Sequence, residues 1–92
     1  MTKKKGGNNT CGKRVKIARI SNDMNQLQLA TALNVDSSID VNQHSISMIE
    51  RGERFVKDFE LLALAEILDI HPMWLLFGDD LPEKYAYAYA TT

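Results

Sequence analysis

The sequence contains a single cysteine, Cys11, and no stretch of 18 consecutive apolar residues. One cysteine excludes an internal disulfide and favours a reducing compartment. Without a long apolar stretch, we expect neither a membrane-spanning helix nor the apolar part of a secretion signal. These absences together predict a cytoplasmic protein.

Residues suited to catalysis or metal binding are also few. The two histidines, His44 and His71, and the single Cys11 lie in different segments, at no spacing typical of metal ligands. The sequence brings together no nucleophile, base and orienting acid, and it contains no glycine-rich phosphate loop. We therefore expect a protein that is not an enzyme and that binds no metal or cofactor.

Charge is distributed unevenly along the chain, although the net charge is only −1. Residues 1–57 hold ten Lys or Arg against five Asp or Glu, a net charge of +5, whereas residues 58–92 hold one against seven, a net charge of −6. A basic half is what a nucleic-acid-binding surface requires. A merely solvated polar surface would give the same asymmetry.

Ninety-two residues, 45% of them hydrophobic, suffice for one domain with a modest core. Apolar residues recur at helical spacing in short segments separated by residues typical of turns. The expected helices cover about 10–22 with Thr10 as N-cap, 25 to 34 or 35 with Asn25 as N-cap, 42–52 with Asn42 as N-cap, about 59–69 after Asp58 as N-cap, and a short segment from His71-Pro72 to Gly78. Five short helices indicate an all-α bundle.

The segment 42–52 has the features of a recognition helix. Only Ile46 and Ile49 are aliphatic, and their spacing of three puts them on one face as anchors. The opposite face carries uncharged or small polar groups that can approach base edges. Gly52 suits the end of the helix, where positive φ is needed.

The order of several segments resembles the Cro and phage-repressor helix-turn-helix family. The resemblance covers about residues 13–78 and is carried by Gln26-Leu27-Gln28-Leu29-Ala30, Ile46-Ser47-Met48-Ile49-Glu50-Arg51-Gly52, Leu61 to Ile70, and Trp74-Leu75-Leu76-Phe77-Gly78. It implies a five-helix, lambda-repressor-like DNA-binding bundle over residues 10–78.

One feature departs from the usual pattern of that family. About four residues normally separate the Val that closes the second helix from the first Ile of the third, whereas ten separate Val35 from Ile46 here. Ile39-Asp40-Val41 and Arg54 to Leu61 look like a bacterial subgroup with this longer turn. The added loop, 36–41, changes the expected angle between the two helices and the registry of base contacts.

The resemblance also implies roles for particular residues. It implies contacts with DNA phosphates for Asn25, Gln26, Asn42, Arg54 and Lys57, which position the protein without reading sequence. It implies base contacts for the outer face of the recognition helix, formed by Gln43, His44, Ser47 and Met48. Gln can bond adenine bidentately, and Met can pack on a thymine methyl.

Arg19 and Glu50 match a charge pair that in the family ties the first helix to the third. Two independent surface charges are the alternative. Such a pair is poor evidence for net stability, because desolvation offsets the attraction. Its expected role is to fix the orientation of the recognition helix.

We therefore predict a sequence-specific regulator that binds double-stranded DNA, expected to be a repressor acting as a homodimer on an inverted repeat. Two alternatives remain: an antitoxin whose C-terminal tail docks a toxin, and a helix-turn-helix module that binds only protein. The basic half and the polar outer face of residues 42–51 favour DNA over the latter.

The two ends of the chain flank this domain. Residues 1–9 are interpreted as a basic arm whose three lysines could contact phosphates, or as a solubilising tail. In the tail, 79–92, Tyr85, Tyr87 and Tyr89 alternate with alanine, which is the period of a strand. Pairing of that strand with a second copy would make the dimer, and a disordered tail or a dimer through Trp74 and Phe77 are the alternatives.

Overall fold

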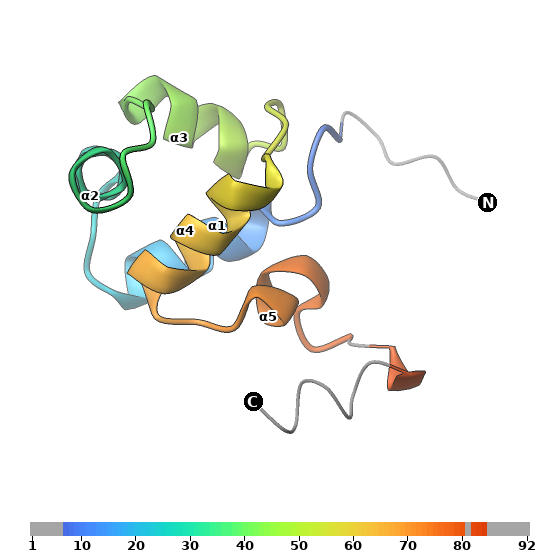
Figure 1. Ribbon diagram of the computed structural model, residues 1–92. Helices are drawn as coiled ribbons and strands as arrows, with labels where there is room; N and C mark the ends of the chain where they lie inside the picture. Colours follow the sequence, from blue (N-terminus) through green and yellow to red (C-terminus); the bar gives the residue numbers. More distant parts are fainter. Residues whose placement is uncertain (1–6, 81, 85–92) are drawn as a thin grey trace.

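In the part of the chain that the structure describes, five α-helices pack around one core (Figure 1). The computed structural model describes residues 7–80 and 82–84. In these ranges the helices are α1 (Gly12–Ser21), α2 (Gln26–Ser37), α3 (Gln43–Glu50), α4 (Asp58–Leu68) and α5 (Pro72–Phe77), and no strand is present. The predicted all-α, five-helix bundle is confirmed. The predicted tyrosine strand lies outside the described residues.

The core forms where α1, α2, α3 and α4 meet, and α5 closes it from the side of α1 and α4. Its fully buried side chains come from all five helices, and they include Val15, Leu29, Leu33, Ile46, Ile49, Leu64, Leu68 and Leu75. Leu61 packs at the edge of this core and is only partly buried. Burial of these groups is the main favourable contribution to folding. Through Ile46 and Ile49, α3 shares the core while its outer face stays accessible.

Capping boxes start both helices of the helix-turn-helix pair. The Asn25 side chain accepts from the N–H of Gln28 at 2.7 Å, and the Gln28 side chain accepts from the N–H of Asn25 at 2.7 Å. Asn42 and Ser45 make the same reciprocal contacts at the start of α3. Each box satisfies two backbone donors that the helix itself cannot. The predicted N-caps Asn25 and Asn42 are therefore confirmed.

Two other predicted N-caps are wrong by one residue. Helix α1 begins after Cys11 rather than Thr10, and the Asn9 side chain accepts from the N–H of Gly12 at 2.8 Å. Helix α4 begins after Lys57, so Asp58 is its first helical residue. There the Glu60 side chain accepts from the N–H of Lys57 at 3.0 Å. In both cases a side chain other than the predicted cap, Asn9 or Glu60, also accepts from a backbone donor at the start of the helix.

The long turn before α3 is shortened by α2, which continues to Ser37 instead of ending at residue 34 or 35. Ser38 then takes a left-handed conformation with φ 56°, and Ile39 and Val41 turn into the core. The Asn34 side chain accepts from the N–H of Val41 and donates to its carbonyl at 2.7 Å. The added residues are thus ordered by burial and by Asn34, and they lead directly into the Asn42 cap.

Helix α5 is fastened to α1 by one arginine. Arg14 Nε donates to the carbonyl of Leu75 at 2.9 Å, and its Nη2 donates to those of Leu76 and Thr10 at 2.8 and 3.0 Å. The end of a helix has carbonyls without intrahelical partners, which a guanidinium can satisfy. A six-residue helix with one fully buried side chain gains its place in the fold partly from this contact.

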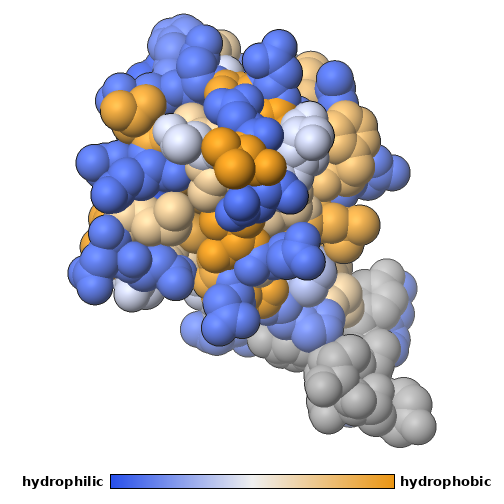
Figure 2. Space-filling view, turned by 60° about the vertical axis from the view of Figure 1, so that its left-hand side comes forward, coloured by the Kyte–Doolittle hydropathy of each residue, from blue (hydrophilic) through white to orange (hydrophobic). Residues whose placement is uncertain are grey.

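Several large hydrophobic side chains remain on the surface. Figure 2, which brings the α2 side of the molecule forward, shows hydrophobic groups along the middle of this face, interrupted by hydrophilic ones. Exposed examples are Leu27 and Val35 in α2, Phe55 in the loop after α3, and Phe59 and Leu62 in α4. Interspersed polar residues break such surface into small areas, as is common in folded proteins.

We predict that Gly12→Ala destabilises the fold by about 1–3 kcal/mol, because the added methyl group is forced into an occupied space. A Cβ at this position would overlap the backbone oxygen of Ile49 in α3. Denaturant unfolding measures the loss. Lys13→Ala, at an exposed neighbouring position, is the control and should stay within about 0.5 kcal/mol. Equal stabilities of the two variants would show that α1 and α3 are not in close contact.

Candidate nucleic-acid interface

The outer face of α3 presents the four residues predicted to contact bases. Gln43 and His44, in the first turn, are exposed, whereas Ser47 and Met48, one turn later, are half-buried. The aliphatic residues of the helix point the other way into the core. The amide of Gln43 and the imidazole of His44 are therefore accessible to a ligand. The side chains of Ser47 and Met48 are less accessible.

Ser47 already has a partner on this face. Arg51, at the C-cap of α3, donates from Nη1 to the Ser47 hydroxyl at 2.7 Å and from Nη2 to Glu53 Oε1 at 3.1 Å. Arg51 and Glu53 are half-exposed, so the salt bridge contributes little to stability. No role was predicted for Arg51, although a cation four residues after Ser47 shares its helix face.

The expected pair between α1 and α3 is present and buried. Arg19 Nε donates to Glu50 Oε2 at 2.6 Å and Nη2 donates to Oε1 at 3.1 Å, which makes the contact bidentate. The two side chains are 10% and 3% exposed. A third donor, Nη1, reaches the carbonyl of Met24 at 2.8 Å. Among the described residues, no buried side-chain nitrogen or oxygen lacks a partner, so the pair is fully satisfied.

Gln26 joins this pair at the start of α2. Its Nε2 donates to Glu50 Oε1 at 3.0 Å, which places the first turn of α2 beside the last turn of α3. The side chain predicted to contact a phosphate is thus directed to Glu50. Arg19 balances the carboxylate charge, which would otherwise repel an anion approaching this corner.

Backbone N–H groups at the start of α2 are still able to donate to such an anion. The capping box uses the N–H of Gln28, and the N–H of Leu29 donates to the carbonyl of Asn25 at 3.1 Å. The N–H groups of Gln26 and Leu27 have no acceptor within the helix, as at every helix start. With the helix dipole, they form a place where a phosphate is favoured.

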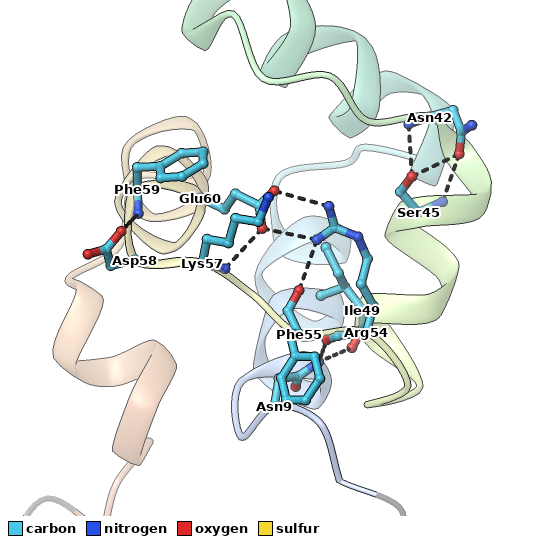
Figure 3. Close-up of polar contacts among 10 residues, drawn as sticks. All are labelled: Asn9, Asn42, Ser45, Ile49, Arg54, Phe55, Lys57, Asp58, Phe59 and Glu60. Atoms are coloured by element: carbon cyan, nitrogen blue, oxygen red, sulfur yellow. Dashed lines mark hydrogen bonds and ion pairs between the residues drawn. The ribbon is translucent and has the colours of Figure 1, made fainter.

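Arg54, in the loop after α3, forms a second bidentate ion pair (Figure 3). Its Nη1 and Nη2 donate to the two carboxyl oxygens of Glu60 at 3.0 Å each, and Nη1 also donates to the carbonyl of Phe55 at 3.0 Å. Burial raises the pKa of Glu60, but hydrogen bonds from Arg54 and from the N–H of Lys57, with both positive charges nearby, outweigh it and lower that pKa overall. The guanidinium is therefore held in one place.

Lys57, the other predicted phosphate contact from this loop, is exposed. Its ammonium lies 5.8 Å from the centre of the Phe59 ring, within the range of a cation–π contact. Lys57 and Arg54 therefore lie on the same short connection between α3 and α4.

Two asparagines near the N-terminus, which no sequence pattern marks, hold this loop in place. Asn8 donates from its N–H to the carbonyl of Gly52 at 2.8 Å and from Nδ2 to that of Glu53 at 3.0 Å. Asn9 Nδ2 donates to the carbonyls of Ile49 and Arg54 at 3.1 and 2.8 Å. The described end of the predicted flexible arm is therefore anchored beside α3.

Among the described residues, no group of three His, Cys, Asp or Glu side chains is arranged to hold a metal ion. No helix in the described ranges is long and apolar enough to cross a membrane. Cys11 is buried, and burial raises the pKa of its thiol, so it packs as a small apolar side chain.

Sequence comparison places this geometry in a family. A helix-turn-helix family profile matches residues 15–75, which runs from α1 into α5 and includes both helices of the pair. The chain belongs to the XRE-type helix-turn-helix family, the Cro and phage-repressor group that its motifs resemble.

A curated relative supports the same assignment. The chain is 34% identical over 73 residues to the HTH-type transcriptional regulator DicA of Escherichia coli (strain K12), an alignment that covers 79% of this chain and 50% of DicA. The chain thus spans about half the length of the relative it matches. No solved structure matches the chain.

We predict strong coupling between Arg19 and Glu50 in a double-mutant cycle. Each single change to Ala should cost about 3–5 kcal/mol, because it leaves the other charge buried without its partner. The double variant should lose clearly less than the sum of the two. Denaturant unfolding of the four proteins gives the coupling free energy, and strictly additive losses would show that the pair does not hold α1 to α3.

A second prediction concerns the stability of the fold at acidic pH. Folding lowers the pKa of Glu60, so the ionised carboxylate stabilises the folded state. This stability is fully present above the pKa of the unfolded chain, about 4.3, and is lost as pH falls through the pKa of the folded protein. The free energy of unfolding of the wild type should therefore approach that of Glu60→Gln as pH falls below about 4. Denaturant unfolding at several pH values measures the difference, and a difference independent of pH would exclude this linkage.

Proposed function

We propose that the protein is a transcriptional regulator that binds double-stranded DNA in a sequence-specific way, with α3 in the major groove. The observation that carries the proposal is the exposed first turn of α3, with Gln43 and His44 outward on a helix whose other face is fixed in the core. An α-helix fits the major groove, and Gln can bond adenine N6 and N7 together. Membership of the family and the match to DicA support the proposal.

Base contacts in this proposal come from Gln43 and His44, with Ser47 and Met48 further along the groove. Met48 would pack on a thymine methyl. Ser47 would act together with Arg51, which already binds its hydroxyl. The Asn34 side chain bonds to both backbone groups of Val41 and so fixes the point at which α3 starts. This contact supports the placement of Gln43 and His44 in the first turn of the helix.

Phosphate contacts would lie on both sides of the recognition helix. On one side are the N–H groups at the start of α2, next to Asn25 and Gln26, and on the other the side chains of Arg54 and Lys57. Asn42 would reach the backbone from the start of α3. These contacts fix the orientation of the protein on DNA and make binding depend on salt.

We further propose a repressor that acts in the cytoplasm as a homodimer on an inverted repeat. One 92-residue domain with one short recognition helix reads only part of a site, and two copies related by a two-fold axis read two half-sites. Repression follows when the bound dimer occupies a promoter. The reduced, buried thiol of Cys11 is compatible with a reducing compartment.

The proposal predicts that selection from random duplex DNA recovers an inverted repeat, and that binding to it weakens steeply with salt. Gln43→Ala should relax the preference at one base pair in each half-site and cost about 1–3 kcal/mol of discrimination. Fluorescence anisotropy with the selected duplex and its single-base variants measures both effects.

The matched control is Thr31→Ala, on the exposed surface of α2, where the hydroxyl donates to the carbonyl of Leu27 in the same helix at 2.9 Å. It should keep wild-type preference and affinity. Recovery of no sequence over random DNA at moderate salt would overturn the proposal. An unchanged base preference in Gln43→Ala would show that another residue reads the DNA.

A further inference from the structure

The Asn9 side chain bonds to three separate segments of the chain, and Figure 3 draws two of these contacts, to Ile49 and to Arg54. Its Oδ1 accepts from the N–H of Gly12 at the start of α1, and its Nδ2 donates to the carbonyl of Ile49 in α3 and of Arg54 in the following loop. The donated bonds span 40 and 45 residues of sequence. The side chain therefore caps one helix and fastens the end of another.

Arg54 is consequently held at both ends. Asn9 fixes its backbone carbonyl at 2.8 Å, and the buried carboxylate of Glu60 fixes its guanidinium through two hydrogen bonds of 3.0 Å. A long side chain held in this way loses little conformational freedom when it binds a ligand, which raises affinity. The two bonds to Glu60 and the one to the carbonyl of Phe55 use three of the five guanidinium N–H groups, which leaves two for a phosphate.

We propose that Asn9 is a positioning residue for DNA binding: it holds the backbone of Arg54 against the end of α3, so that the guanidinium is pre-organised for a phosphate. Asn9 acts through Arg54 and does not itself touch the DNA. This inference rests on the proposed function for its DNA part. Its structural part, the placement of Arg54 against Glu60, concerns the free protein and can be tested without DNA.

The test uses Asn9→Ser and a matched control, Asn22→Ser. Serine keeps a hydroxyl oxygen that can accept from the N–H of Gly12, but its single, shorter O–H donor cannot replace both amide bonds to Ile49 and Arg54. Asn22 Nδ2 likewise donates to two carbonyls, of Ala18 at 2.8 Å and Leu68 at 3.0 Å, and so joins α1 to α4 away from the recognition helix. Both changes keep the net charge and remove two amide hydrogen bonds.

The first measurement is the pKa of Glu60, from carboxyl-carbon NMR of the free full-length proteins. In Asn9→Ser it should rise toward the ordinary glutamate value, because Arg54 no longer stays in place, whereas Asn22→Ser should keep the lowered wild-type value. A Glu60 pKa that is the same in Asn9→Ser and the wild type would overturn the proposal.

The second measurement is the slope of log Kd against log salt concentration, on the duplex selected by the wild type. Losing one phosphate contact should reduce this slope by about 1 in Asn9→Ser and leave it unchanged in Asn22→Ser. A wild-type slope in Asn9→Ser, with the pKa shifted, would contradict the DNA role. If the Glu60 pKa is shifted in Asn9→Ser but the wild-type protein prefers no DNA sequence, the result supports the positioning of Arg54 and refutes the proposed function instead.

Discussion

The recognition helix depends on a buried ion pair. Arg19 and Glu50 meet through two hydrogen bonds between α1 and α3, and Gln26 adds a third at the start of α2. With eight residues, α3 is too short to be stable alone, so its position comes from tertiary contacts. Because removing either charge would leave the other buried without its partner, the pair favours the arrangement of these three helices in which the two charges meet. This supports a structural role for the pair in orienting α3, beyond any net gain in stability.

Other contacts fix the two ends of α3 in the same way. Before the helix, Asn34 binds both backbone groups of Val41 and leads the longer turn into the Asn42 cap. After it, Asn9 binds the carbonyls of Ile49 and Arg54. These amides bond to backbone, which holds a segment without fixing the side chains that it displays. The displayed side chains can therefore be substituted without removing these bonds.

Much of this arrangement could be predicted from sequence. Local chemistry identified the caps Asn25 and Asn42, periodicity identified most of the core, and resemblance to the family identified the ion pair. The missed contacts share a physical cause: Asn8, Asn9 and Asn34 bond mainly to backbone carbonyls, which every residue carries and no sequence pattern marks. The end of α2 was misplaced because its last turn is largely exposed, so no apolar periodicity marks it.

The central claim is that α3 and the start of α2 form one DNA-binding surface. The most direct measurement is the change of backbone amide NMR shifts when the selected duplex is added to the wild-type protein. The account predicts the largest changes at the N–H groups of Gln26, Leu27, Gln43 and His44, with a smaller group at Arg54. Changes confined to the exposed faces of α4 and α5, with these amides unmoved, would contradict it.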